Sequence, residues 1–384
     1  MRRFSWIFVT VLICGIAMGE DISDNFSYDG LTRSYLLHIP PQHNGIDSLP
    51  LVIALHGYGS YCTGFMNYIQ MNTKGDTEGF LVCYPNGTGS ENRAWNAGMC
   101  CTDTSGPEVD DVGFISALID TIMEGYVVDT FRIYATGMSN GGMMSHRLAC
   151  ELSDRIAAVA PVAGGLVLAD FDDCQPERAI PVMHIHAIDD DVVFYYGGSH
   201  GEMTTASIDS VMRTWARKDS CDLGPDTTEF TGAFVQKWSR STDEGPPIEV
   251  HSWTTNDGGH TWPGSVNGTQ AIIANDLMWD FFTAHPMPDD ESGVAEEPGF
   301  KLDPANPGIF TRSTAIRFAI DEAQQLTLTL YDAAGRKVAV LVEGTLDAGQ
   351  HSVVLDASSF PDGVYFYRLV TPGFATTRSL TVIR

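Results

Sequence analysis

The fold is decided by residues 133–144, which read Ile133-Tyr134-Ala135-Thr136-Gly137-Met138-Ser139-Asn140-Gly141-Gly142-Met143-Met144. The run 133–136 is β-prone, and from Ser139 to Leu152 the apolar residues recur at helical spacing, so a strand passes into a helix at Ser139. Glycines on both sides of this serine suit a turn too tight for side chains. The pattern predicts a nucleophile elbow. The alternative is an ordinary glycine-rich turn with an N-capping serine.

Further apolar runs place this turn in a larger sheet. Residues 51–55 form an unbroken apolar run, typical of a strand buried on both faces, and are followed by the loop His56-Gly57-Tyr58-Gly59. The glycines of this loop let backbone N–H groups approach a ligand. We expect the amides of Tyr58 and Asn140 to form an oxyanion hole. An ordinary strand-ending turn is the alternative for this loop.

The remaining elements of the first 285 residues alternate between strands and helices, which predicts an α/β fold with a mostly parallel sheet. Asp110 and Asp111 precede one of the helices and are interpreted as N-cap and dipole residues. Strands are expected at residues 28–39, 80–84, 156–162, 179–188, 233–238 and 248–253, and helices at 112–123, 139–152, 205–218 and 271–282.

Candidate partners for Ser139 follow two of the later strands. Asp189, Asp190 and Asp191 come after the strand at 179–188, at the edge where an α/β sheet carries its active site. One of the three is placed to orient a histidine, and a solvated acidic turn is the alternative. His260 lies in a glycine-rich loop after the strand at 248–253, where the general base of a Ser…Asp…His order belongs.

Aromatic and sulfur-containing residues suggest further roles. Trp95 and Trp262 are predicted to line the substrate cleft with Tyr58, and packing within their loops is the alternative. His184 and His186 alternate onto one face of a strand but lack a third ligand, so we interpret them as core or supporting histidines. Seven cysteines follow residue 19; Cys83 is expected to be the free thiol, and the other six to form up to three disulfides. No metal or cofactor is expected.

Composition and charge indicate where the protein is exported, which partners are disfavoured and where its domains begin and end. Residues 1–19 have the basic, apolar and small-residue regions of a secretory signal peptide. The net charge of −27 disfavours nucleic acid and other polyanions as partners. No later apolar run is long enough to span a membrane.

Residues 286–300 are an acidic, proline-rich linker, and residues 301–384 show short alternating runs that predict an immunoglobulin-like β-sandwich. The enzyme domain is expected at 20–285.

Several motifs occur together in one order. They are Leu55-His56-Gly57, Trp95-Asn96-Ala97-Gly98 with Cys100-Cys101, Val109-Asp110-Asp111-Val112-Gly113-Phe114, Gly137-Met138-Ser139-Asn140-Gly141-Gly142 and Gly259-His260-Thr261-Trp262-Pro263-Gly264. Over roughly residues 25–285 the chain resembles the polyhydroxybutyrate depolymerase and feruloyl esterase family of α/β-hydrolases. The resemblance implies Ser139 as nucleophile, His260 as base and Asp190 as the third member, with Asp189 and Asp191 as fallbacks.

The C-terminal region resembles the sorting domains of the type IX secretion system. The resemblance rests on Pro304-Ala305-Asn306-Pro307, Tyr331-Asp332-Ala333-Ala334-Gly335-Arg336, Ala348-Gly349-Gln350-His351 and Asp362-Gly363-Val364-Tyr365-Phe366-Tyr367-Arg368-Leu369. It implies a secreted or cell-surface protein that meets the secretion machinery. The predicted function is a secreted serine esterase acting on a polyester or on feruloyl or acetyl esters of plant polysaccharide through an acyl-enzyme. A serine peptidase and a catalytically inactive surface binding protein are the alternatives.

Overall fold

The computed structural model describes residues 19–89, 92–101, 109–167, 171–200, 203–242, 247–288, 300–302, 305, 309–310, 312–320, 322–332, 336–371 and 375–383. The expected signal peptide (1–19) and linker (286–300) lie almost entirely outside these ranges. The chain divides into two compact units, Met1–Pro288 and Asp289–Arg384. Each unit has its own hydrophobic core.

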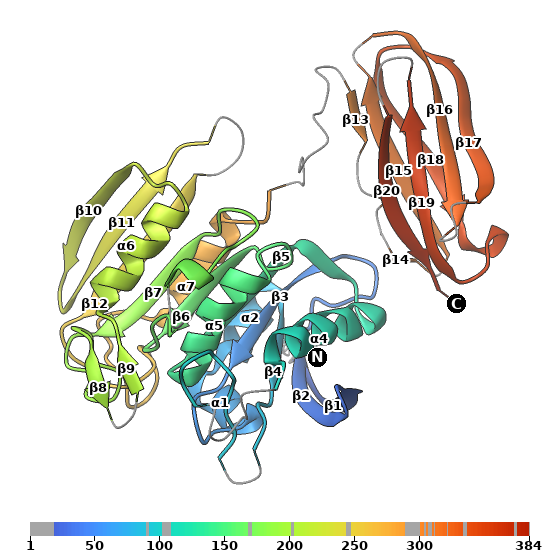
Figure 1. Ribbon diagram of the computed structural model, residues 1–384. Helices are drawn as coiled ribbons and strands as arrows, with labels where there is room; N and C mark the ends of the chain where they lie inside the picture. Colours follow the sequence, from blue (N-terminus) through green and yellow to red (C-terminus); the bar gives the residue numbers. More distant parts are fainter. Residues whose placement is uncertain are drawn as a thin grey trace, which may run out of the picture. The chain divides into compact units, whose positions relative to one another are not determined.

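The first unit is built on a ten-stranded sheet with the order β1-β2-β4-β3-β5-β6-β7-β12-β11-β10 (Figure 1). The six central strands, from β4 to β12, pair in parallel, and the strands at both ends pair antiparallel. The strands are β1 (Glu20–Tyr28), β2 (Leu31–Ile39), β3 (Leu49–Leu55), β4 (Leu81–Pro85), β5 (Val128–Met138), β6 (Ala158–Val162), β7 (Val182–Ala187), β10 (Leu223–Phe230), β11 (Ala233–Arg240) and β12 (Ile248–Thr255). A separate hairpin is formed by β8 (Gly198–His200) and β9 (Met203–Thr205).

Helices cover both faces of this sheet. They are α1 (Cys62–Ile69), α2 (Met71–Glu78), α4 (Asp111–Gly125), α5 (Asn140–Glu151), α6 (Ile208–Lys218) and α7 (Ala274–Ala284), with one 3₁₀ turn, η1 (Phe171–Asp173). In β3, Leu51 and Ile53 belong to the core that contains α4, α5 and α6, whereas Val52 and Ala54 belong to the core that contains α1, α2 and α7. This strict alternation confirms that the apolar run at 51–55 is buried on both faces. The predicted α/β fold is confirmed.

The sequence analysis did not predict helices α1 and α2, strands β1 and β10, or the β8–β9 hairpin. The sequence of α2 has no apolar stripe and contains Gly75, yet the helix forms because Met71 and Gly75 pack against the sheet. A Cβ at position 75 would lie 3.0 Å from the carbonyl oxygen of Phe80, so a larger residue would require the two segments to separate by a few tenths of an ångström. The strand expected at 28–39 is β2, and it pairs with β1 in a hairpin that turns at Asp29 and Gly30, both with positive φ. An Asp-Gly pair at a two-residue turn is a strong hairpin signal that the sequence reasoning missed.

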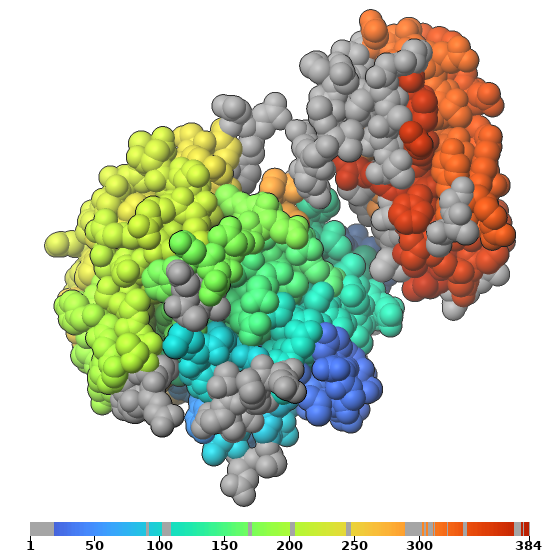
Figure 2. Space-filling view, in the orientation of Figure 1, coloured from blue at the N-terminus to red at the C-terminus, as the bar shows by residue number. Residues whose placement is uncertain are grey.

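The far edge of the sheet is exposed. Most side chains of β10 are exposed, since this strand pairs only with β11 within the described part of the chain. In Figure 2, the yellow-green residues that include α6 and β10 form one side of the first unit's surface. No helix in the described ranges is both long enough and apolar enough to cross a bilayer.

The second unit is a small β-sandwich, as predicted. One sheet has the order β13-β15-β18 and the other β14-β20-β19-β16-β17. Its core includes Phe318, Leu328 and Tyr367, and in β19 the buried Tyr367 alternates with exposed neighbours. The elements are β13 (Phe300–Leu302), β14 (Ile309–Phe310), β15 (Ser313–Ile320), β16 (Gln324–Asp332), β17 (Lys337–Leu346), β18 (Gly349–Asp356), η2 (Ala357–Ser359), β19 (Gly363–Val370) and β20 (Ala375–Val382).

Two disulfides form among the seven cysteines that follow residue 19. They join Cys100 to Cys101 and Cys150 to Cys174. Cys83 is a buried free thiol, as predicted, but Cys62 and Cys221 are free as well, so the expectation of a third bridge is wrong. Cys62 begins α1 and Cys221 follows α6, and these helices pack on opposite faces of the sheet.

Candidate active site

Ser139 occupies a strained turn between β5 and α5. Its φ of 57° and ψ of −122° lie in a region that non-glycine residues rarely adopt. The strain is held by two backbone hydrogen bonds, from Ser139 N to Val162 O and from Met143 N to Ser139 O, both 2.9 Å long. The turn therefore fixes the Ser139 side chain at the carboxyl edge of the sheet and at the N-terminus of α5, as a nucleophile elbow requires.

The glycines around Ser139 are required by close backbone contacts. A Cβ at Gly141 would lie 2.1 Å from the carbonyl oxygen of Leu55, and one at Gly137 would lie 2.5 Å from that of Gly141. On the other side, a Cβ at Gly164 would lie 2.1 Å from the carbonyl oxygen of Ser139. The Gly-x-Ser-x-Gly spacing is thus explained by β3 and the end of β6 crowding the turn.

Asp190 is the member of the acidic triplet that reaches His260. The Nδ1 of His260 donates to Oδ2 of Asp190 over 2.8 Å, and Asp190 itself is buried. Its other oxygen, Oδ1, accepts the backbone N–H groups of Val192 and Val193 at 2.9 and 2.8 Å. Burial alone would raise the pKa of Asp190, but hydrogen bonds from His186 and His260 outweigh it and hold this pKa below its usual range.

The two neighbouring carboxylates are used differently. Asp189 is exposed, and its Oδ1 accepts the backbone N–H of Gly259 at 2.8 Å, which ties the acidic loop to the loop that carries His260. Asp191 is exposed. The geometry therefore separates the three candidates that the sequence left together.

Ser139 and His260 follow strands of the same parallel group. Ser139 follows β5, Asp190 follows β7 and His260 follows β12, so all three stand at the carboxyl edge. Within the described residues, no hydrogen bond joins the Ser139 hydroxyl to the His260 ring. Because Nδ1 donates to Asp190, the remaining ring nitrogen of His260, Nε2, is the acceptor in the neutral state.

The loop after β3 lies directly beside Ser139. A Cβ added at Gly57 would lie 3.4 Å from the Cβ of Ser139 and 4.0 Å from its Oγ. His56 holds this loop, since its Nδ1 donates to Gly57 O at 2.8 Å and its Nε2 accepts Gly87 N at 3.0 Å. Burial lowers the pKa of His56 to about 4, so the ring stays neutral and keeps both bonds. Tyr58, whose amide we predicted to be an oxyanion donor, follows Gly57 and is 48% exposed.

Trp95 connects this loop to the start of α5. Its indole Nε1 donates to His56 O at 2.9 Å, and its backbone N–H and C=O bond the Asn140 side chain at 2.7 and 3.0 Å. The Trp95 side chain is 0% exposed, so the prediction that it lines the substrate cleft is wrong. It packs under the site and fixes the distance between Gly57 and Asn140. The Asn140 amide begins α5 and has no acceptor within the helix.

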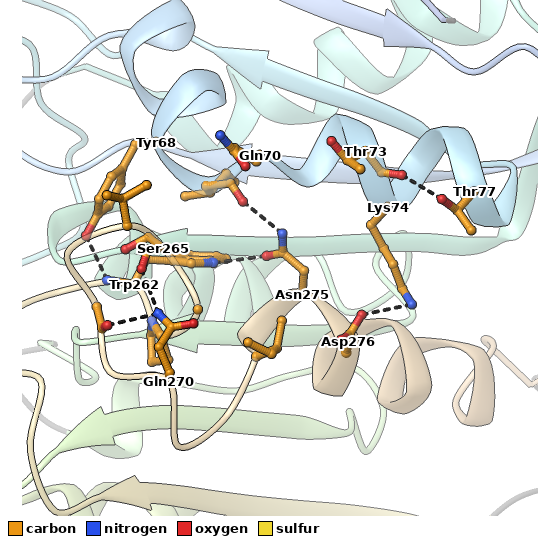
Figure 3. A pocket seen from close by; sticks show the side chains of 16 residues that line it. Tyr68, Gln70, Thr73, Lys74, Thr77, Trp262, Ser265, Gln270, Asn275 and Asp276 are labelled. Atoms are coloured by element: carbon orange, nitrogen blue, oxygen red, sulfur yellow. Dashed lines mark hydrogen bonds and ion pairs between the residues drawn. The ribbon is translucent and has the colours of Figure 1, made fainter. Parts of the chain in front are cut away.

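Trp262 is also buried, but it borders an open pocket of about 750 Å³ (Figure 3). Its Nε1 donates to Asn275 Oδ1 at 3.0 Å, and its backbone N–H donates to the Tyr68 hydroxyl at 2.9 Å. At the other end of the pocket, Nζ of Lys74 lies 3.0 Å from Oδ1 of Asp276. The pocket lies between the α1–α2 junction and the segment that follows His260, and it is lined by Tyr68, Ile69, Gln70, Thr73, Lys74, Thr77, Trp262, Pro263, Gly264, Ser265, Val266, Gly268, Gln270, Ile273, Asn275 and Asp276.

Two acids at the start of α4, the exposed Asp110 and the buried Asp111, make further polar contacts. Asp110 caps α4 by accepting the Gly113 N–H at 2.8 Å, which confirms its N-cap assignment. Asp111 pairs with the buried Arg33 at 2.6 Å and accepts the Asn96 N–H at 2.7 Å. The described residues contain no group of three or more His, Cys, Asp or Glu side chains that could hold a metal ion. Sequence reasoning missed the roles of Arg33 and His146, which appear only once distant elements are packed together.

Comparison with known proteins identifies both units. The Esterase PHB depolymerase family model matches residues 33–214, and the secretion system C-terminal sorting domain model matches residues 310–383. Feruloyl esterase B of Piromyces equi is 29% identical over 264 residues, which cover 67% of this chain and 46% of that protein. The putative esterase NocK of Nocardia uniformis subsp. tsuyamanensis is 30% identical over 253 residues, which cover 62% of this chain and 72% of that protein.

A bifunctional acetylxylan esterase/xylanase of Neocallimastix patriciarum is 33% identical over 163 residues, or 41% of this chain and 22% of that protein. The chain thus spans less than half the length of this protein and of the Piromyces enzyme. The structure of an acetyl xylan esterase from Aspergillus awamori shares the fold, with a TM-score of 0.50, 17% identity, and coverage of 68% of this chain and 99% of that one. The sorting domain marks an exported protein, secreted or at the cell surface. The chain therefore belongs to the PHB depolymerase family of esterases and carries a secretion-system sorting domain.

Proposed function

We propose that the protein is an exported serine esterase in which Ser139, His260 and Asp190 form a catalytic triad. The observation that carries the proposal is the 2.8 Å hydrogen bond from His260 to the buried Asp190, at the sheet edge where Ser139 stands in its strained turn. Membership of an esterase family supports the class of reaction. In this arrangement Asp190 fixes the His260 tautomer that leaves Nε2 free to take a proton.

The reaction proceeds in two halves. His260 Nε2 takes the Ser139 proton while Oγ attacks the ester carbonyl carbon, and the backbone amides of Tyr58 and Asn140 donate to the resulting oxyanion. The ester C–O bond then breaks, the leaving alkoxide takes the proton from His260, and the acyl group remains on Ser139. A water molecule, deprotonated by His260, attacks the acyl-enzyme and releases the carboxylic acid and the free serine.

The substrate class we propose is an ester carried by a neutral polymer. The names of the relatives indicate feruloyl and acetylxylan esters for those proteins, and the family model names a polyester depolymerase. The net charge of −27 disfavours polyanionic polymers. The pocket beside Trp262 offers hydroxyl and amide side chains, such as those of Thr73 and Gln270, that suit a neutral polysaccharide. We propose that it holds the polymer near the scissile ester.

The direct test replaces Ser139 by alanine in the exported protein. Ser139→Ala should abolish hydrolysis of p-nitrophenyl acetate while the circular dichroism spectrum stays unchanged. Ser210→Ala, an exposed serine of α6, is the matched control and should keep wild-type activity. Esterase activity close to wild type in Ser139→Ala would refute the nucleophile assignment.

A substrate panel separates the proposed function from its alternatives. Wild-type protein is incubated with feruloylated and acetylated xylan, short-chain polyhydroxybutyrate and a casein substrate. Release of ferulate, acetate or hydroxybutyrate supports an esterase and identifies its acyl group. Casein cleavage without ester turnover supports a serine peptidase, and binding of xylan without any turnover supports a binding protein.

A further inference from the structure

Three buried histidines form a continuous chain behind Asp190. The chain starts at Trp215 in α6, whose Nε1 donates to His146 Nδ1 at 3.0 Å. His146 Nε2 is 3.2 Å from His184 Nδ1, and His184 Nε2 is 3.0 Å from His186 Nδ1. At its end His186 Nε2 lies 2.7 Å from Val193 O and 3.3 Å from Asp190 Oδ2. The chain thus joins α5, α6 and β7 to the proposed triad.

The direction of every bond in this chain follows from its two ends. The indole N–H of Trp215 only donates, so His146 accepts at Nδ1 and carries its proton on Nε2. The His146 Nε2–H therefore donates to Nδ1 of His184, which leaves the His184 proton on Nε2. That proton is donated in turn to Nδ1 of His186, so the His186 proton is on Nε2 as well. The last N–H points at a carbonyl and a carboxylate oxygen, which only accept. All three tautomers are therefore fixed, and the bond dipoles all point toward Asp190.

Burial keeps two rings of the chain neutral. Burial lowers the pKa of His146 to about 3 and puts the pKa of His184 well below its usual value. Neighbouring rings are stacked, with centroids 5.4 Å apart for His146 and His184 and 5.2 Å apart for His184 and His186. None of the four side chains from Trp215 to His186 is more than 1% exposed. The chain is thus a buried array of aligned dipoles.

We propose that this chain is a positioning network that fixes the His186 Nε2–H against Val193 O and beside Oδ2 of Asp190, and so favours an ionised carboxylate turned toward His260. The proposal deepens the proposed function and rests on it. Oδ2 accepts the His260 N–H at 2.8 Å and lies 3.3 Å from His186 Nε2, whose N–H also meets Val193 O at 2.7 Å, and Oδ1 accepts two backbone amides. Both carboxylate oxygens therefore face donors, which disfavours turning Asp190 away from His260.

The network does not conduct protons. A relay needs a group at its far end that accepts a proton, and the indole of Trp215 has only a donor. The titratable groups around Asp190 are His184 and His186 from β7, His260 from the loop after β12, and its exposed neighbours Asp189 and Asp191. Only His260 among the histidines changes its charge in the reaction. The effect of the chain on catalysis is therefore electrostatic and orientational.

The test removes the donor at the far end of the chain, the Trp215 indole N–H, while leaving Asp190 and its direct partners intact. Trp215→Phe keeps an aromatic ring in α6 but deletes the N–H, so His146 loses the bond that fixes its tautomer. Trp279→Phe is the matched control, because Trp279 is a buried indole of α7 that stacks on Phe80 in the other core. The constants kcat and KM for p-nitrophenyl acetate, and their ratio kcat/KM, are measured from pH 4 to pH 9 for both variants.

We expect Trp215→Phe to lower kcat roughly three- to tenfold with little change in KM, which is the effect of one hydrogen bond. Without the indole N–H, the chain of hydrogen bonds polarises the His186 N–H less, so Asp190 becomes more basic and stabilises the protonated His260 ring. The acid limb of kcat/KM should therefore move to higher pH by about half a unit to one unit. An unshifted pH profile in folded Trp215→Phe, or an equal shift in Trp279→Phe, overturns the proposal.

The tautomers themselves are tested without any assay of activity. In ¹⁵N-histidine-labelled wild-type protein, NMR correlations through the ring carbons should show His146, His184 and His186 neutral and protonated on Nε2. A ring of this set that is protonated on Nδ1, or that carries a charge at pH 7, overturns the proposal even where Trp215→Phe does not fold. Absence of ester turnover in wild type would instead refute the proposed function and leave this NMR result standing.

Discussion

The His260 ring donates Nδ1–H to Asp190 Oδ2 over 2.8 Å, although 70 residues separate the two in the chain. They meet because β7 and β12 are parallel neighbours, so the loops after both strands leave the sheet at the same edge. The two loops are also joined by the backbone N–H of Gly259, which donates to the side-chain Oδ1 of Asp189. The pair is thus fixed by the sheet rather than by local sequence.

Replacement of Asp190 should damage catalysis far more than replacement of its neighbours. Asp190→Asn keeps the shape but presents a neutral group to His260, which no longer stabilises the imidazolium; kcat should fall by roughly three orders of magnitude. The exposed Asp191→Asn is the matched control and should stay within twofold of wild type. Steady-state kinetics on p-nitrophenyl acetate measure kcat for both variants. An equal loss of kcat in the two variants would contradict the assignment of Asp190.

Glycine at position 141 should be irreplaceable. In Gly141→Ala the new Cβ would lie 2.1 Å from Leu55 O, so either β3 or the elbow has to move. We expect the melting temperature to fall by several degrees or more and esterase activity to be lost. Gly125→Ala, at the exposed end of α4 where a Cβ meets nothing within 4 Å, is the control and should be neutral or stabilising by about 0.5 kcal/mol. Equal melting temperatures for the two variants would exclude the steric argument.

Much of the site could be predicted because its parts obey local rules. The elbow at Ser139 is visible in the glycine spacing, and the edge position of His260 follows from the strand that precedes it. The choice among Asp189, Asp190 and Asp191 needs the structure, since three consecutive acids differ only in which one the loop turns inward. The resemblance to a family indicated Asp190 where residue patterns alone did not.

The rest depends on contacts between distant elements. His146 stands in a helix whose pattern explains it as a core residue, and only the packing of α5 on β7 brings it to His184. Trp95 was misinterpreted because a tryptophan near a glycine loop is compatible with both a cleft wall and a buried support. Helix α2 escaped prediction because its own residues carry no amphipathic stripe; the stability comes from the sheet beneath it.

The pocket beside Trp262 should matter for polymeric substrates only. Thr73→Trp places a large ring at its exposed wall without touching Ser139 or His260. The ratio of acetyl-xylan to p-nitrophenyl acetate hydrolysis should fall about tenfold, because a blocked subsite costs binding of the polymer alone. Glu124→Trp, on the exposed surface of α4, is the control and should leave the ratio unchanged. A ratio that stays at the wild-type value in Thr73→Trp would place polymer binding elsewhere.

The buried Asp219 should make stability depend on pH in the direction opposite to that of an ordinary paired carboxylate. Burial raises its pKa from 3.8 to about 7, although Oδ1 accepts the Ile180 N–H at 3.0 Å. Between these two values the folded protein binds the proton more tightly than the unfolded chain, so the free energy of unfolding falls as pH rises across this window and levels off above it.

Asp219→Asn removes this ionisation and retains an oxygen acceptor for Ile180. The difference in unfolding free energy between variant and wild type should therefore grow in favour of the variant from pH 4 to pH 8, by on the order of a few kcal/mol at about 1.4 kcal/mol per pKa unit. Taking the difference cancels the acid sensitivity contributed by buried histidines such as His56 and His146, which both proteins share. Urea unfolding at four pH values measures it, and the exposed Asp222→Asn should show no such trend. A difference independent of pH would mean that Asp219 is already ionised in the folded protein at pH 4.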